Sequence, residues 1–251
     1  MRPRFLRGFW KLTWLETKIF TREPMGFVGT LIMPVVVFVA LGRAFSVSTP
    51  VPARKVEVPF NVAILAAVLI AISAVQSLTA IISIYREGGI LKRLRSTPLS
   101  PVTIMGAQVV VKLVFTVISL TLLMLAGKRL FPGVMQVNVF SFTLAVLLGT
   151  FSILSLGFVL ASLVPTARFA QPIGALVLYP MLALSGLFFP VARFPQWLRA
   201  IAYALPTTHA VALLQGVWNG SGWSAHWVNV AALFLLFGVF TAVSTRVFRW
   251  E

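Results

Sequence analysis

Six apolar stretches constrain this chain more than any other feature of its sequence. A helix needs about 20 predominantly apolar residues to cross about 30 Å of hydrocarbon, and the stretches fall at about 25–45, 60–84, 104–126, 139–163, 171–189 and 228–247. The sequence is 59% hydrophobic and 10% charged, whereas roughly a quarter of the residues in a soluble domain are charged. We therefore predict an all-α integral membrane protein with six transmembrane helices.

Residues 1–24 are too charged to span a membrane and predict an amphipathic interfacial helix instead. At about 100° per residue, one face gathers Arg4, Arg7, Lys11, Lys18 and Arg22, and the other gathers Phe5, Phe9, Leu12, Ile19 and Phe20. Such a helix lies flat on an anionic cytoplasmic headgroup layer. Packing on the rest of the protein is the alternative, which Glu16 within the apolar face favours. The sequence leaves both open.

The basic residues set the predicted topology. Of the 21 lysines and arginines, 13 fall on one side of the predicted spans, seven fall on the other, and Lys112 alone lies within an apolar stretch. Because cytoplasmic loops carry the excess of Lys and Arg, we predict that both termini are cytoplasmic and that the protein lies in a bacterial cytoplasmic membrane. This distribution accounts for the net charge of +16. Membrane lipid is therefore an expected partner, and nucleic acid is not.

Residues 25–251 predict one six-helix transmembrane domain with two distinct segments. Residues 85–103 form a charged cytoplasmic loop between the second and third spans. Residues 190–227 are half apolar but are interrupted by Pro195, Pro206 and Gly216, too often for one span. We expect short helices there that re-enter the outer leaflet, which requires protein to cover their backbone.

The ionisable residues argue against catalysis and metal binding. All five acidic residues are glutamates outside the predicted spans, so no carboxylate is expected at membrane depth for ion coupling. Cysteine is absent, and no stretch matches the glycine-rich phosphate loop of ATP-binding proteins. His209 and His226 lack a neighbouring carboxylate or thiol, which favours ordinary packing over a zinc site. We predict a transport subunit that is not an enzyme and binds no cofactor itself.

Two polar features lie within the predicted spans. A small and polar stripe on the second span comprises Ser73, Gln76, Ser77, Ala80 and Ser83. Such a stripe either lets two helices approach closely or faces a substrate or a subunit. Lys112 lies about nine residues into the third span, roughly 13 Å from its inner end. Its ammonium group either snorkels to the membrane surface or lines a wet cavity.

Three motifs resemble a known transporter family. Residues 86–100, REGGILKRLRSTPLS, look like the cytoplasmic loop of bacterial ABC-2 type permeases. The segments LSGLFFP at 184–190, FPQWL at 194–198 and LPTTH at 205–209 resemble the signature between the last two spans of those permeases. Residues 22–24, REP, are similar to the family's entry into the first span. Over nearly its whole length, the chain resembles permeases of drug-resistance and lipo-oligosaccharide exporters, with departures at Lys92 and Gln108.

The resemblance implies a homodimer whose two copies sit on two separately encoded ATP-binding-cassette subunits, which bind ATP and magnesium. A helix in the inner loop would contact the ATPase through Glu87, Gly88, Ile90, Leu91, Arg93 and Leu94. The second and fifth spans would face the dimer axis, which makes Ser73, Gln76, Ser77, Leu184 and Phe188 candidate pathway residues. The re-entrant segment would form an outer gate with Phe189, Pro190, Pro195, Trp197 and Pro206.

The expected function is therefore ATP-driven export of an amphiphilic or lipid-linked substrate, because an apolar, acid-free pathway suits such cargo better than a free cation. One alternative is an ion-coupled or passive carrier that works without an ATPase. Another is a membrane assembly factor that does not transport. The sequence does not choose among a drug, a lipid and a polysaccharide as cargo, identify the ATPase or prove the direction of transport.

Overall fold

Helices make up the architecture of this protein in a computed structural model, which describes residues 2–22, 27–47, 62–90, 101–130, 137–164 and 166–247. These ranges contain no strand. Five of their helices are long and apolar enough to cross a membrane: Ile64–Glu87, Gly106–Leu130, Val139–Leu163, Ala167–Leu184 and Ser224–Val247. The shorter apolar helix Val28–Ala40 lies within the predicted first span. The predicted all-helical membrane fold is confirmed.

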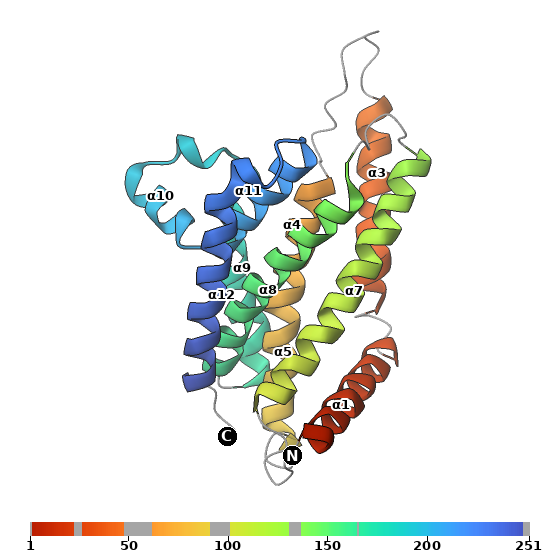
Figure 1. The fold of residues 1–251 in the computed structure, drawn as a ribbon, viewed down its shortest axis with the longest axis vertical. Helices are drawn as coiled ribbons and strands as arrows, with labels where there is room; N and C mark the ends of the chain where they lie inside the picture. The colour runs from red at the N-terminus through yellow and green to blue at the C-terminus, as the bar shows by residue number, and fades with distance from the viewer. Residues whose placement is uncertain are drawn as a thin grey trace.

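The spans follow one another as a bundle (Figure 1). The first comprises η1 (Val28–Ile32) and α3 (Met33–Val47), and the second comprises α4 (Val62–Ile72), η2 (Ser73–Ser77) and α5 (Leu78–Glu87). The others are α7 (Pro101–Leu130), α8 (Val139–Leu163), α9 (Ala167–Leu184) and α12 (Trp227–Val247). The amphipathic helix α1 (Arg2–Arg22) and the end of α12 lie at the same end of the bundle (Figure 1).

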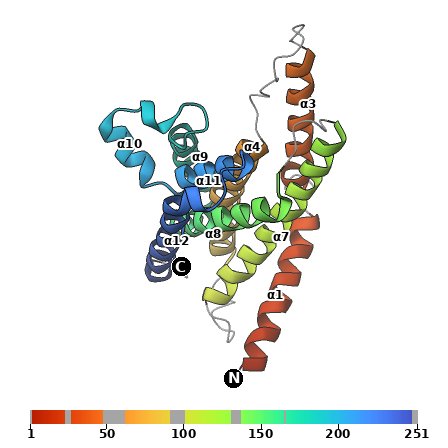
Figure 2. The same cartoon turned by 45° about the horizontal axis from the view of Figure 1, so that its top comes forward.

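The helix α8 is the centre of this bundle. Its span is 61% buried, against 11% for the span that contains α12. The helices α4, α5, α11 and α12 pack around α8 (Figures 1 and 2). Its start is fixed by Asn138, whose side-chain oxygen accepts hydrogen bonds from the backbone N–H groups of Phe140 and Ser141. Its side chains Phe142, Ile153 and Leu154 form much of the main core.

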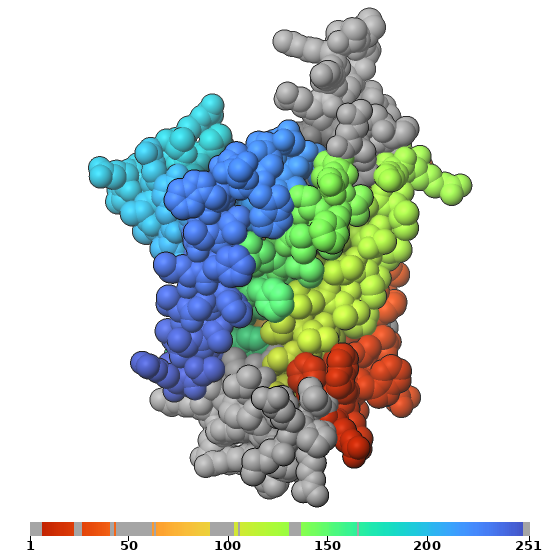
Figure 3. Space-filling view, in the orientation of Figure 1, coloured from red at the N-terminus to blue at the C-terminus, as the bar shows by residue number. Residues whose placement is uncertain are grey.

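The N-terminal helix α1 packs along α7 at the edge of the bundle (Figure 3). Its inner face buries Leu12, Glu16 and Phe20, whereas Trp10 and Trp14 are exposed on the opposite side. Packing against protein therefore accounts for one face of α1. The exposed tryptophans have the amphipathic chemistry that is typical of a membrane interface.

The segment between α9 and α12 contains a sharply bent helix pair. It comprises η3 (Val191–Arg193), α10 (Gln196–Tyr203), α11 (Pro206–Trp218) and η4 (Ser224–His226). The axes of α10 and α11 differ by 82°. Pro206 starts α11, where its fixed φ suits the first helical turn. Since α11 is mostly buried and packs on α8 and α4, protein covers its backbone, as the predicted re-entrant segment requires.

The fifth span ends earlier than the sequence predicted. The expected range was 171–189, but α9 ends at Leu184. Gly186 then adopts a φ of 86°, a left-handed conformation that commonly follows the last turn of a helix. Phe188 and Phe189 consequently lie beyond the helix and are exposed. The apolar run continues past the helix end, which is why hydrophobicity alone misplaced the boundary.

Candidate functional site

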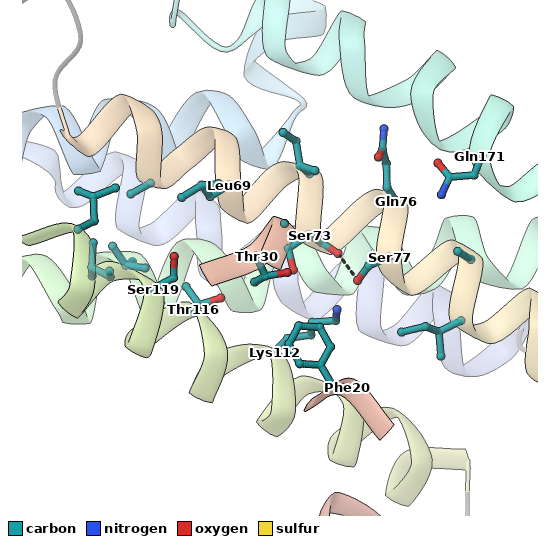
Figure 4. A pocket seen from close by; sticks show the side chains of 18 of the residues that line it. Phe20, Thr30, Leu69, Ser73, Gln76, Ser77, Lys112, Thr116, Ser119 and Gln171 are labelled. Carbon is teal, nitrogen blue, oxygen red and sulfur yellow. Dashed lines mark hydrogen bonds between the residues drawn. The ribbon is translucent and has the colours of Figure 1, made fainter. Parts of the chain in front are cut away.

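A cavity of about 460 Å³ lies beside the second span, between that span and η1, α1, α7, α8 and α9 (Figure 4). This volume falls in the range of small-molecule sites in proteins, roughly 300–1,000 Å³. Its polar lining residues are Thr30, Ser73, Gln76, Ser77, Lys112, Thr116, Ser119 and Gln171. Its apolar lining residues include Leu69, Ile72, Ile81, Ile84, Leu120 and Leu123. The arrangement suits a molecule with both polar and apolar parts.

Two π-helical segments, η1 and η2, border this cavity. A π turn accommodates one more residue than an α turn and is frequent at functional sites. Gly29 and Thr30 of η1 line the cavity, as do Ser73, Gln76 and Ser77 of η2. The Ser77 hydroxyl donates a hydrogen bond of 2.9 Å to the Ser73 carbonyl, which satisfies a backbone oxygen within the irregular turn. Both irregular segments thus place polar atoms beside the same space.

Four of the five residues of the predicted polar stripe lie on one surface, and the fifth, Ser83, is buried and is not among the cavity-lining residues. Ser73, Gln76, Ser77 and Ala80 line the cavity. Ala74, at the start of the same turn, contacts α8 at Gly157, where a Cβ atom would lie 2.5 Å from the Ala74 carbonyl oxygen. The segment therefore packs closely on α8 with one side and borders the cavity with the other.

Two candidate pathway residues, Leu184 and Phe188, are not among the residues that line the cavity. Leu184 is the last residue of α9, and Phe188 lies beyond the helix. The candidate residues thus divide into three that share one cavity and two at the far end of the fifth span. Their roles in transport stay predictions.

Lys112 is the one charged residue among the described residues that line the cavity. Its side chain is only 3% exposed, so its position matches the cavity alternative rather than a side chain that reaches the membrane surface. The ammonium Nζ lies 5.2 Å from the centroid of the Phe20 ring, which is a cation–π distance. Phe20 in turn packs on Phe115 with ring centroids 4.2 Å apart. Helix α1 thus supplies part of the surroundings of Lys112.

Glu16 is a functional candidate that the sequence did not identify. Its place in the apolar face of residues 1–24 favoured a protein contact, and the fold shows that it is buried and which residues surround it. The Tyr85 hydroxyl lies 2.9 and 2.8 Å from its two carboxylate oxygens and can donate to either. Burial raises the pKa of the Glu16 carboxyl, and Tyr85, Gln108 and the charge of Lys112 partly oppose that rise. A buried carboxyl group therefore lies near the cavity lysine, although all acidic residues fall outside the predicted spans.

The inner end of the second span is bonded to the α8–α9 turn. The Arg86 guanidinium donates to the carbonyl oxygens of Ala161 and Val164, at the C-terminal end of α8. The Glu87 carboxylate accepts a hydrogen bond of 2.8 Å from the N–H of Ala167, the first residue of α9. This dipeptide therefore links three helices.

The other predicted ATPase-coupling residues are only partly described. Helix α5 ends at Glu87, and Gly88 and Gly89 form a turn in which Gly89 has a φ of 64°. Ile90 is exposed. Leu91, Arg93 and Leu94 lie outside the described residues, so the predicted contact helix stays a prediction.

The predicted outer-gate residues lie around the bent pair. Phe189 and Trp197 are exposed, Pro190 and Pro195 precede η3 and α10, and Pro206 is buried at the start of α11. Only Pro206 belongs to the buried part of this segment. A gating role for the five residues stays a prediction.

The two histidines take part in a hydrogen-bond network that joins α11 to α12. The ring nitrogens of His209 lie 3.0 Å from Asn229 Oδ1 and 2.9 Å from the Tyr203 carbonyl oxygen. His226 lies 3.3 Å from Asn229 Nδ2 and 3.1 Å from the Ser221 hydroxyl. Among the described residues, no group of three potential metal ligands occurs. The network accounts for both histidines as packing residues of the bent segment.

Comparison with known proteins matches residues 7–218 to the ABC-2 type transporter family. The chain is 30% identical to the inner membrane transport permease YhhJ of Escherichia coli and of Shigella flexneri over 166 residues, which are 65% of this chain and 44% of each relative. It is 33% identical to nodulation protein J of Rhizobium leguminosarum over 95 residues, which are 38% of this chain and 37% of the relative. The matched region thus spans less than half the length of these relatives.

Proposed function

This chain belongs to the ABC-2 type transporter family, and we propose that it is the membrane-spanning subunit of an ATP-driven exporter for an amphiphilic or lipid-linked substrate. The observation that carries the proposal is the cavity along the second span, which combines polar and apolar walls at membrane depth. Its volume and mixed lining suit an amphiphile better than a free ion.

The proposal includes a separate ATPase. Two copies of this chain would assemble with two ATP-binding-cassette subunits, which would bind ATP and magnesium. YhhJ is described as an inner membrane transport permease, which supports a place in the bacterial cytoplasmic membrane. Both termini would be cytoplasmic, as the distribution of Lys and Arg predicts.

The mechanism would be alternating access driven from the inner end of the second span. Closure of the ATPase dimer would move the residues around Glu87, and the hydrogen bond from Ala167 to Glu87 would carry that movement to α9. The cavity residues Ser73, Gln76 and Ser77 lie on the same span, so they would move with its inner end. The outer gate around Phe189 and Trp197 would then open, and Leu184 and Phe188 would border the exit.

An ion-coupled carrier is the second candidate, and one observation favours it. Glu16 is a buried carboxyl group near Lys112, and burial raises its pKa. A protonatable group beside a cavity is a feature of proton-coupled transporters. Transport in vesicles with a proton gradient and no ATPase would support this candidate over the exporter.

The first test is co-purification of this chain, in nanodiscs, with the ATP-binding-cassette protein encoded beside its gene. We expect a complex with two copies of each subunit whose ATP hydrolysis increases when this chain is present. Absence of a complex with any cassette protein would reject the exporter proposal and favour the carrier.

Substitutions in the inner loop test the coupling role. We expect Glu87→Arg and Leu91→Asp to preserve insertion in the membrane but to uncouple ATP hydrolysis from export. Glu87→Arg reverses the charge at the predicted contact with the ATPase, and Leu91→Asp places a charge where an apolar contact is predicted. The measurement is export and ATP hydrolysis by the reconstituted complex. Lys128→Asp, at the opposite end of α7, is the control. Normal export by both inner variants would show that these residues do not couple the subunits.

A further inference from the structure

The cavity follows one face of the second span for most of its length. Its lining residues on this span, among them Ala66, Leu69, Ser73, Gln76 and Ile84, recur at helical spacing. At 1.5 Å per residue, positions 66 to 84 extend over about 27 Å. A volume of about 460 Å³ along that length describes an elongated space. Its shape suits a long, narrow molecule.

Polarity changes along the cavity. Leu69 lies toward the end of the cavity at which α4 begins (Figure 4). Leu120 and Leu123 of α7 follow Lys112 toward the same end, because α7 runs opposite to the second span (Figure 1). Toward the middle, Ser73 and Ser77 of η2 face Lys112 and Thr116 of α7 (Figure 4). Ile81 and Ile84 line the other end of the cavity. The polar middle therefore lies between two apolar sections, and a single-chain amphiphile would place its chain in one of them.

The polar section contains one formal positive charge among the lining residues that the structure describes, on Lys112. A buried ammonium group loses its hydration and is stabilised by a negative charge. Thr116 and Ser119 follow Lys112 by four and seven residues, so all three share a face of α7. Among the described residues, the buried Ser119 hydroxyl has no hydrogen-bond partner, and it lies where the polar section meets Leu120. A cation with hydroxyl groups on the same helix face suits an acidic group.

The charge of Lys112 also acts on Glu16, but Glu16 does not line the cavity. Its carboxylate oxygens are instead held by the Tyr85 hydroxyl at 2.9 and 2.8 Å. Lys112 therefore borders the open cavity and also acts electrostatically on an internal carboxyl group.

We propose that this cavity binds an anionic amphiphile, with Lys112 and the neighbouring hydroxyl groups holding its phosphate or carboxylate and the leucine-lined section holding its hydrocarbon chain. This inference rests on the proposed transport function and narrows the cargo to acidic amphiphiles.

The test measures binding of radiolabelled hexadecyl phosphate to the full chain in phosphatidylcholine nanodiscs, with empty nanodiscs as background. We expect saturable binding that Lys112→Gln weakens at least tenfold, equivalent to about 1.4 kcal/mol. Lys112→Arg retains the charge and should bind within about threefold of the unmodified chain. Lys128→Gln removes a charge outside the cavity and should leave binding unchanged. Unlabelled hexadecanol should compete poorly because it lacks the acidic group.

Further arms separate the possible outcomes. The double variant Glu16→Gln/Lys112→Gln removes the carboxyl group together with the ammonium group, so neither buried charge is left without the other. It should therefore fold, and it should still bind hexadecyl phosphate weakly. Wild-type affinity in either Lys112→Gln chain would overturn the proposal, and displacement by millimolar inorganic phosphate alone would assign the site to a free anion. This assay needs no ATPase. If the chain binds hexadecyl phosphate as predicted but forms no complex with any cassette protein, the exporter proposal is rejected and the binding site is kept. If the chain works as an exporter but its binding does not depend on Lys112, only the binding site is rejected.

Discussion

Among single residues, Gly157 determines how closely the fourth span approaches the second. A Cβ atom there would lie 2.5 Å from the carbonyl oxygen of Ala74 and 3.1 Å from its carbonyl carbon. These are backbone atoms, which cannot rotate away as a side chain can. Glycine also brings its Cα–H toward that oxygen, a weak hydrogen-bond geometry that is common between closely packed helices.

Gly157→Ala should therefore destabilise the protein by about 1–3 kcal/mol, the usual cost of overpacking. Gly238→Ala is the matched control, because beyond the backbone of its own helix no described atom lies within 4 Å of the Cβ it would add. That control should be neutral or stabilising by about 0.5–1 kcal/mol, since alanine favours the helix. Thermal unfolding in detergent measures both. Equal stability of the two variants would contradict the close contact.

Glu16 predicts a pH dependence of α1 docking. Burial raises its pKa above 4.5, so the folded state binds the proton more tightly than the undocked state. The free energy that holds α1 in place should therefore fall as pH rises from about 4.5 through the raised pKa. Glu16→Gln has no such titration, and its amide oxygen can still accept a hydrogen bond from Tyr85.

Hydrogen exchange of the α1 amides, corrected for the intrinsic effect of pH, measures this dependence. Protection of α1 should decrease with rising pH in the unmodified chain and stay level in Glu16→Gln. Identical profiles in the two proteins would show that Glu16 does not control docking.

Among the helices, Arg86 and Glu87 join the inner ends of α5, α8 and α9. Arg86 bonds to carbonyl groups at the C-terminal end of α8, where the helix dipole is negative, and Glu87 bonds to the N–H of Ala167 at the positive end of α9. Each charge therefore lies at the helix end that it stabilises. The inner end of the second span cannot move alone without breaking these bonds.

Exchanging the two charges, in the double variant Arg86→Glu/Glu87→Arg, keeps the net charge but places each at the wrong helix end. We expect several-fold faster hydrogen exchange at the amide of Ala167, which loses its acceptor. Arg168→Gln is the control, because Arg168 is an exposed neighbour. Unchanged exchange at Ala167 in the exchanged variant would show that the turn is held by other contacts.

The helices also show what the sequence could predict. Hydrophobic length predicted the second, fourth and sixth spans to within three residues at each end, because lipid requires long apolar helices. Helical spacing identified Ser73, Gln76 and Ser77 as one face, which borders the cavity. It did not predict the π turn at these residues, because one inserted residue leaves the apolar pattern of the span almost unchanged. The position of Glu16 in the apolar face favoured a protein contact, but its partner Tyr85 could not be predicted, because that residue lies 69 positions away in the sequence.

For the whole molecule, the proposed homodimer predicts which outer face meets the second copy. Both α9 and α12 expose large apolar residues, including Leu176 and Tyr179 on α9 and Phe234 on α12. The family resemblance implies that the fifth span, α9, faces the dimer axis. Exposure alone does not decide between them, because lipid also covers apolar surface.

Disulfide trapping can decide, since the chain has no cysteine of its own. Leu176→Cys should form a covalent dimer on mild oxidation in membranes, whereas Phe234→Cys, at a similarly exposed position, should stay monomeric. Gel mobility without reducing agent reports the outcome. Efficient trapping at residue 234 and none at 176 would place the dimer axis at α12 instead.

The buried ammonium group of Lys112 also has an electrical consequence. A unit charge that crosses the full membrane field gains or loses about 2.3 kcal/mol per 100 mV, and Lys112 lies within the third span. A cavity that holds one acidic group carries less positive charge than the same cavity when empty. When the substrate enters and leaves the cavity, its negative charge would then move through part of the transmembrane electric field. The membrane potential would therefore affect each turnover, in addition to the energy supplied by ATP.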